Sequence, residues 1–371
     1  MKHLFNGLAL WLGTLDTLAN HVGLRGVNWG GAASGPLLAL AGLRGRPHAG
    51  SLLATLPLAL PLQVGLACLA RPGLNPKRQL LPGDYVNRTV QQLDIPAEYG
   101  PVPALQIAPK GGARVAVCVA HGSGCDKTFY AWRLADALVR AGMAVLLVDL
   151  DGHGESPRPQ AFPDIVESVA GPARWLRARY EHVALLGMSL GGAVTARAVA
   201  EGAPCDALAL WESPPRLRLT DAEYRRAQVA EAIGVIRPSL IHLFRDGTAY
   251  HVARGWRTSG IRARIGTWDL FDQLDLLGSL GRVQARQERP PLLLVYAGRD
   301  AVLHPGSDTE VQSATAGWGE FNRIPGACHV SLPIEPETIR LTVGWLGRTL
   351  SARTHPTPPL PLRERGLGGE G

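Results

Sequence analysis

Five short apolar runs recur along the chain, and amphipathic stretches separate them. The runs are rich in Val, Leu and Ala and nearly free of charge, which is typical of parallel strands buried on both faces. Helical patterns such as 129–141 and 170–179 lie between them, and this alternation predicts a mostly parallel sheet with helices on both faces. The predicted strands are residues 115–120, 143–149, 183–187, 207–211 and 292–297.

Shorter patterns extend the predicted sheet at both ends. Residues 89–95 and 104–107 come before the first run and predict an antiparallel hairpin at the edge of the sheet. Residues 320–324 form one more short run after the last of the five predicted strands.

The long segment 212–289 interrupts this alternation because it has no clear strand pattern. Thr220 is followed three residues later by Glu223, which is the capping box that begins many helices. The pair predicts a helix over 220–233, and we interpret the whole segment as a mainly helical insertion between two strands of the sheet.

A serine with the sequence context of a nucleophile follows the third predicted strand. Residues 187–191 read Gly-Met-Ser-Leu-Gly and fit the pattern G-x-S-x-G, and the small-residue helix pattern AVTARAVA comes soon after them. Between a strand and a helix, this pattern predicts a sharp turn that exposes the hydroxyl of Ser189 above the sheet. Because a serine hydroxyl is a poor nucleophile at neutral pH, it needs a base, and the base needs an acid that orients it.

Asp300 and His329 supply a matching acid and base in the expected chain order. Asp300 follows the run 292–297, and His329 follows the run 320–324. In proteins with this serine turn, the acid and then the histidine come after the serine. We therefore predict a triad of Ser189, His329 and Asp300 at the ends of successive strands.

Other side chains compete for two of these roles. Glu212 directly follows the run that ends at residue 211 and is the alternative acid. His304 and His153 are the alternative bases, but His304 is close to Asp300 in the chain and His153 precedes the serine. The chain order therefore favours His329.

A glycine-rich turn follows the first predicted strand. Residues 121–124 read His-Gly-Ser-Gly, and such a turn leaves backbone N–H groups pointing into a site. We predict that the N–H groups of Ser123 and Leu190 form an oxyanion hole. Cys125 and Lys127 come just after this turn, and two interpretations of them stay open: contact with the substrate, or exposure to solvent.

Together these motifs resemble the α/β-hydrolase fold. The motifs are HGSG, GHGES, GMSLGG, GRD and CH, and the set is similar to the branch that contains monoacylglycerol lipases, lysophospholipases and proline-iminopeptidase-like serine aminopeptidases. The resemblance covers roughly residues 85–350. It implies an eight-stranded sheet, a helical cap after the sixth strand and a site under that cap, with Ser189, Asp300 and His329 at the family's catalytic positions.

The resemblance divides the chain into a core, a cap and two outer segments. Residues 81–211 and 290–352 form the expected hydrolase core, and residues 212–289 form the expected helical cap. Residues 1–80 and 353–371 fall outside the resemblance, and the second of these segments is rich in Pro, Gly and Arg, which predicts a disordered tail.

Charge and hydropathy set the N-terminal segment apart from the rest. Residues 1–80 contain seven basic residues and one acidic residue, so they carry most of the net charge of +7. Residues 51–70 are uncharged over about the length that crosses a bilayer core. Two interpretations stay open: a membrane anchor attracted to anionic headgroups, or short helices packed on the body. The nearly neutral remainder argues against nucleic acid as a partner.

Five cysteines, widely spread and without a C-x-x-C pair, argue against a disulfide framework or a structural zinc site. They favour a reducing compartment, so we expect a cytoplasmic protein, with or without membrane association. The sequence predicts no metal and no organic cofactor.

The combined interpretation is a serine hydrolase that cleaves a carboxylic ester, or a related acyl bond, of a small-molecule acyl substrate through an acyl-enzyme. A lipase-like activity fits this prediction. An acyltransferase or an aminopeptidase on the same fold is the alternative, while the complete triad disfavours a non-catalytic membrane-tethered protein. Because one fold hosts many chemistries, the choice depends on the site.

Overall fold

The computed structural model describes residues 2–21, 29–70, 80–129, 131–216, 223, 226–227 and 261–351. They form three N-terminal helices and an α/β body, and each of these parts is described by itself. The predicted helix over 220–233 lies almost entirely outside the described residues, as does the greater part of the predicted cap 212–289. The whole of the predicted tail 353–371 lies outside them.

The body is built on one nine-stranded sheet in the order β1-β2-β3-β5-β4-β6-β7-β8-β9. The strands from β4 to β9 run parallel, whereas β1, β2 and β3 pair antiparallel at one edge. This arrangement confirms the predicted fold class, and the two-residue β1 is an addition to the eight strands that the resemblance implies. The strands are β1 (Gly83–Asp84), β2 (Arg88–Ile95), β3 (Val102–Pro109), β4 (Val115–Ala120), β5 (Ala144–Val148), β6 (His182–Met188), β7 (Ala207–Trp211), β8 (Leu292–Ala297) and β9 (Gly319–Ile324).

The five apolar runs correspond to the five central strands. The predicted bounds of β4, β7 and β8 are correct, and those of β5 and β6 differ by one residue at each end. Every residue of β5, β7 and β8 is buried, because helices cover both faces of the sheet and leave no polar alternation. The predicted edge hairpin is confirmed as β2 and β3, with Val90 opposite Ile107.

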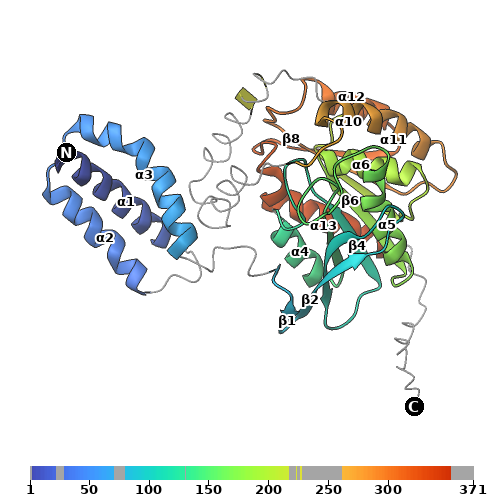
Figure 1. Cartoon of the computed structure of the whole chain (residues 1–371), viewed down its shortest axis with the longest axis horizontal. Coiled ribbons are helices and arrows are strands. Elements are labelled where there is room, and N and C mark those ends of the chain that lie inside the picture. Colours follow the sequence, from blue (N-terminus) through green and yellow to red (C-terminus); the bar gives the residue numbers. More distant parts are fainter. Residues whose placement is uncertain are drawn as a thin grey trace, which may run out of the picture.

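Helices form a layer on each face of the sheet (Figure 1). One apolar cluster joins the sheet to α5, α6, α10 and α11, and a second cluster joins it to α4 and α13. α10 and α11 fall within the predicted insertion, and both contact α6, so this part of the segment belongs to a helical layer of the body. The helices of the body are α4 (Ala131–Arg140), α5 (Glu167–Arg177), α6 (Leu190–Ala200), α10 (Thr267–Leu274), α11 (Leu276–Gln284), α12 (Ser307–Ala314) and α13 (Pro336–Ser351).

Glycines bring the first turn of α6 into backbone contact with its neighbours. A Cβ atom at Gly187 would overlap the backbone of Gly191, at the start of the helix. A Cβ atom at Gly191 would overlap the carbonyl oxygens of Ala120 and His121. The start of α6 therefore lies directly against the end of β4, where the glycine-rich turn 121–124 begins.

Three helices make up the N-terminal part: α1 (Lys2–His21), α2 (Trp29–Arg44) and α3 (Ala49–Ala70). α1 packs against both α2 and α3 (Figure 1). Within the described ranges of the chain, no helix combines the length and the apolar character that crossing a membrane requires.

Replacing Gly191 with alanine should destabilise the body, because the added methyl group has no space against the carbonyl oxygens of Ala120 and His121. We expect the free energy of unfolding to fall by ~1–3 kcal/mol, measured by chemical denaturation. Gly281→Ala is the matched control, since nothing lies within 4 Å of a Cβ atom at that exposed helical position. There, alanine should raise the free energy of unfolding by up to ~1 kcal/mol. If both substitutions changed the free energy of unfolding by the same amount, the close backbone contact at Gly191 would be contradicted.

Candidate active site

Ser189, His329 and Asp300 come together in space although they are far apart in the sequence. Ser189 Oγ lies 3.2 Å from His329 Nε2, and His329 Nδ1 lies 2.7 Å from Asp300 Oδ2. The hydroxyl can therefore donate to one ring nitrogen while the other ring nitrogen donates to the carboxylate. The three residues follow β6, β9 and β8, at the edge of the sheet where parallel strands end and ligands commonly bind.

Ser189 occupies a sharp turn between β6 and α6. Its backbone has φ of 49° and ψ of −115°, a conformation that non-glycine residues rarely adopt. Its amide donates to the carbonyl of Trp211 at 2.8 Å, which ties the turn to the end of β7. The residue is half-buried, while its neighbours Met188 and Leu190 are buried, which is compatible with the accessible serine that G-x-S-x-G predicts.

Asp300 is held in its charged form by several donors. Its Oδ1 accepts from the amides of Val302 at 2.7 Å and Leu303 at 2.8 Å, while Oδ2 faces the His329 ring. Burial by itself raises the pKa of Asp300, but the His329 ring and the two amides outweigh burial, so the pKa lies below its ordinary value. A carboxylate in this position can stabilise an imidazolium on His329.

A second carboxylate, that of Glu212, reaches the same ring nitrogen. Glu212 Oε2 lies 3.4 Å from His329 Nδ1, and its Oε1 accepts from the amide of Ala297 at 3.0 Å. Glu212 follows β7 in the left-handed conformation, with φ of 47°, and its side chain is 4% exposed. Both candidate acids from the sequence are therefore present at His329, and Asp300 is the closer one.

Within the described residues, Glu212, Asp300 and His329 also form a group whose spacing could suit a metal ion. Ligand atoms of Glu212, Asp300 and His329 lie within 4.8 Å of one another. Both carboxylates already accept from backbone amides, and His329 Nδ1 already faces them. The donor set therefore suits proton transfer along hydrogen bonds better than it suits metal coordination.

The turn 121–124 lies beside Ser189, and a Cβ atom at Gly122 would be 3.4 Å from the Ser189 Cβ. The amides of Ser123 and Leu190 donate to no acceptor in the part of the chain that the structure describes. Leu190 begins α6, where the helix dipole adds partial positive charge. Leu190 directly follows Ser189, and Ser123 directly follows Gly122, so the two amides predicted as oxyanion donors belong to segments that meet at the serine.

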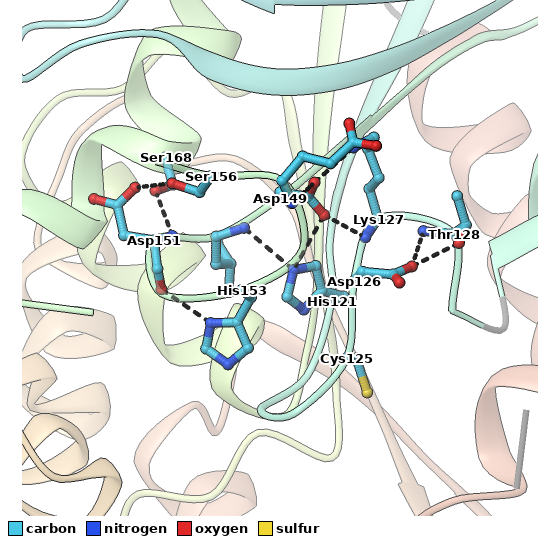
Figure 2. A network of polar contacts seen from close by, with 12 residues as sticks. His121, Cys125, Asp126, Lys127, Thr128, Asp149, Asp151, His153, Ser156 and Ser168 are labelled. Carbon is cyan, nitrogen blue, oxygen red and sulfur yellow. Dashed lines mark hydrogen bonds and ion pairs between the residues drawn. The ribbon is translucent and has the colours of Figure 1, made fainter. Parts of the chain in front are cut away.

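A buried ion pair holds this turn at its far end (Figure 2). Lys127 Nζ donates to Asp149 Oδ2 at 2.6 Å and to Glu155 Oε2 at 2.7 Å, and the Lys127 amide donates to Asp149 Oδ1 at 2.7 Å. Asp149 is fully buried, and the Lys127 side chain is 7% exposed. Burial by itself lowers the pKa of Lys127, but the two carboxylates outweigh burial and raise the pKa. Lys127 therefore does not face solvent, and its ammonium group is occupied by carboxylates instead of being free for a substrate.

His121 fastens the start of the same turn. Its Nδ1 donates to the carbonyl of Gly122 at 2.8 Å, and its Nε2 accepts from the amide of Leu150 at 3.2 Å. Burial lowers the pKa of His121, and burial together with the nearby His121 lowers the pKa of His153 to about 4. Of the two alternative bases, His153 belongs to this buried layer and His304 is exposed, so neither takes the place of the histidine at Ser189.

The comparisons with known proteins agree with this architecture. The chain matches the family model described as serine aminopeptidase, S33, over residues 111–242, a segment that contains Ser189 and the turn 121–124. A comparison with curated protein sequences found no match.

Solved structures resemble the chain at the level of the fold. DcsB, solved in complex with its substrate analogue, is 16% identical with a TM-score of 0.54, and the match covers 72% of this chain and 100% of that one. An esterase of Pyrococcus furiosus is 17% identical with a TM-score of 0.51, covering 73% and 96%. A hypothetical protein from Pseudomonas aeruginosa is 19% identical with a TM-score of 0.52, covering 71% and 95%. The chain therefore has the α/β-hydrolase fold, as the motifs indicated.

Replacing Lys127 with methionine should destabilise the protein strongly, because it leaves the buried Asp149 carboxylate without its cation. We expect the free energy of unfolding to fall by about 3–5 kcal/mol in chemical denaturation. Lys110→Met is the matched control, since the Lys110 ion pair with Asp84 is exposed at 44% and 70% and should contribute at most ~1 kcal/mol. If the two variants were equally stable, the conclusion that the buried Lys127–Asp149 ion pair contributes more to stability than an exposed pair would be wrong.

Proposed function

We propose that the protein is a serine hydrolase that cleaves carboxylic esters through an acyl-enzyme formed on Ser189. One observation carries the proposal: a line of hydrogen bonds runs from Ser189 Oγ to His329 over 3.2 Å and from His329 to Asp300 over 2.7 Å. In such an arrangement, the histidine accepts the proton of the serine hydroxyl while the hydroxyl oxygen attacks a carbonyl carbon. The likeness in fold to an esterase supports esters as the first substrates to test.

In the acylation step, the serine, the histidine, the aspartate and the two backbone amides each have a separate role. Ser189 Oγ attacks the carbonyl carbon of the ester while its proton passes to His329 Nε2. Asp300 stabilises the resulting imidazolium, and the amides of Ser123 and Leu190 donate to the oxyanion. When the intermediate collapses, the bond to the leaving oxygen breaks and His329 Nε2 gives its proton to the departing alcohol.

Deacylation repeats the same steps with water. His329 Nε2 takes a proton from water, the water oxygen attacks the acyl carbon, and the Ser189 oxygen leaves with the proton returned to it. An acyltransferase would use an alcohol or an amine in place of water at this point. An aminopeptidase would cleave an amide in the first step, and the matched family description names that activity. A panel of p-nitrophenyl esters and aminoacyl amides distinguishes these reactions.

Ser189→Ala should abolish ester hydrolysis while the protein stays folded, because the attacking oxygen is removed. We expect kcat/KM for p-nitrophenyl esters to fall by ~10⁴–10⁶ and covalent labelling by a fluorophosphonate to disappear. Ser313→Ala, at an exposed position of α12, is the control that should keep both. Retention of more than a tenth of the activity by Ser189→Ala would refute the assignment.

Substitutions at Asp300 and Glu212 should show which carboxylate orients His329. Asp300→Asn should lower kcat by on the order of 10⁴, because an amide favours the wrong tautomer of the imidazole. Asp300→Ala should keep more activity, since it leaves the Glu212 carboxylate 3.4 Å from Nδ1 free to take over.

The double variant completes this test. Adding Glu212→Gln to Asp300→Ala should remove the remaining activity, whereas Glu212→Gln alone should cost far less than either change at Asp300. The measurements are kcat and its pH profile for each variant. If Glu212→Gln alone proved more damaging than Asp300→Asn, the primary acid would be the one that follows β7.

A further inference from the structure

The N-terminal helical unit, α1 to α3, departs from the burial pattern expected for a helical bundle in water, because no large apolar residue among its described side chains is fully buried. Among the described residues of the unit, the fully buried ones are all small or polar, whereas the large apolar ones are half-buried or exposed. The buried residues are Gly7, Gly13, Gly42, Thr55 and Ala59. Of the twelve large hydrophobic residues exposed in the described chain, nine belong to this unit. We use the name leucine surface for the exposed area that these nine residues of the three helices contribute: Leu4, Phe5, Leu37, Leu38, Leu40, Leu43, Leu53, Leu58 and Leu62.

Glycines hold the three helices close together. A Cβ atom at Gly42 of α2 would lie 2.7 Å from the carbonyl oxygen of Asn6 on α1, and a Cβ atom at Gly7 of α1 would lie 2.9 Å from Thr55 Oγ1 on α3. Backbones that approach this closely require small residues. Small residues at helix contacts with large apolar residues outside are the pattern of helices that pack in lipid, where burial of leucine between helices gives no advantage.

Polar groups inside the unit are satisfied within it. Trp11 Nε1 donates to the carbonyl of Leu52 at 3.0 Å, and Asn6 Nδ2 donates to the carbonyl of Gly45 at 3.1 Å. Thr55 Oγ1 donates within its own helix, 2.7 Å from the nearest acceptor. In an apolar solvent no water is available to bond such groups, so internal partners are necessary. The interior of this unit therefore suits a surface that contacts hydrocarbon.

Basic residues collect at one end of the unit. α1 begins at Lys2, while Arg44 and Arg46 lie at the connection between α2 and α3, and all three are exposed. The rings of His3 and His48, with centroids 4.1 Å apart, show that these two chain segments meet. No acidic residue lies within either segment. Such a cluster is attracted to the phosphates of anionic lipids.

We propose that the α1–α3 unit binds the surface of an anionic lipid bilayer, with the leucine surface at the boundary of headgroups and acyl chains. The basic end, Lys2, Arg44 and Arg46, then lies at the headgroup phosphates. Leucine insertion provides affinity for any bilayer, and the basic end adds the preference for anionic lipid. A second copy of the chain could also cover the leucines, but a like-charged partner would not explain the basic cluster. This arrangement requires no helix to cross the bilayer, and it does not depend on the proposed hydrolase activity.

The test is flotation of the full chain with two kinds of vesicle, phosphatidylcholine alone and phosphatidylcholine mixed with phosphatidylserine. We expect flotation with the mixed vesicles and much weaker flotation with the neutral ones. Changing Lys2, Arg44 and Arg46 together to Gln should weaken binding to the mixed vesicles by on the order of a hundredfold, because each basic residue near the surface contributes about fivefold.

Three exposed leucines provide the second variant. Leu37→Gln, Leu40→Gln and Leu43→Gln, combined in one chain, should prevent flotation with both kinds of vesicle without unfolding the helices, because these side chains are exposed. Val86→Gln is the matched control, since Val86 is a 97% exposed apolar residue of the body and should leave flotation unchanged. Circular dichroism of each variant checks that the helices remain.

Three results would overturn the proposal. The first is a full chain that floats with neither kind of vesicle, and the second is equal binding to both kinds. The third is a dimer in sedimentation velocity that dissociates in the triple-leucine variant while flotation is absent, which would assign the leucine surface to self-association. Fluorophosphonate labelling of Ser189 in every variant reports on the body alone, so failure of the lipid proposal stays separate from failure of the hydrolase proposal.

Discussion

Backbone contact at the first turn of α6 is the constraint on which the rest of the site depends. The three glycines around Ser189 let this turn approach its own strand, the end of β4 and the side chain of Ser213 after β7. Three parallel strands thus meet one helix N-terminus, and Ser189 is held with φ of 49°. A residue keeps such a strained backbone conformation only where the packing around it permits no other. Here, nearly all residues of α6 are buried. The exposed hydroxyl and the available amide of Leu190 are two results of the same packing.

The central sheet was predictable because its strands are buried on both faces. Burial of this kind removes polar residues from the whole run, so local composition alone marks β4, β7 and β8 to the residue. The order of Ser189, Asp300 and His329 was also readable, because each follows a strand and parallel strands end at the same edge. The ends of β2 and β3 were less clear, since an edge hairpin tolerates mixed residues and its bounds follow from pairing.

Other features depend on contacts that no local pattern contains. Lys127 and Asp149 are 22 residues apart, and the one local sign of their ion pair was an acidic residue at the end of a buried strand. The sequence offered Glu212 as an alternative to Asp300. It did not predict that both carboxylates lie near the same ring nitrogen, because this follows from the pairing of β7 with β8. The high leucine content of the N-terminal helices is visible in the sequence. The exposure of these leucines is not, because it depends on the glycine contacts between the helices.

Ser189 and His329 are 140 residues apart in the chain, and this separation matters during synthesis. At ribosomal speed the second residue emerges on the order of 10 s after the first. If His329 is the base, as proposed, a nascent chain that ends before β9 carries Ser189 as an ordinary alcohol that does not attack acyl groups. Under the proposed mechanism, the hydroxyl would become reactive only after β9 has paired with β8 and His329 has reached Ser189. Reactivity of this one oxygen would then indicate that β9 has joined the sheet, although α13 (Pro336–Ser351) still follows it in the chain.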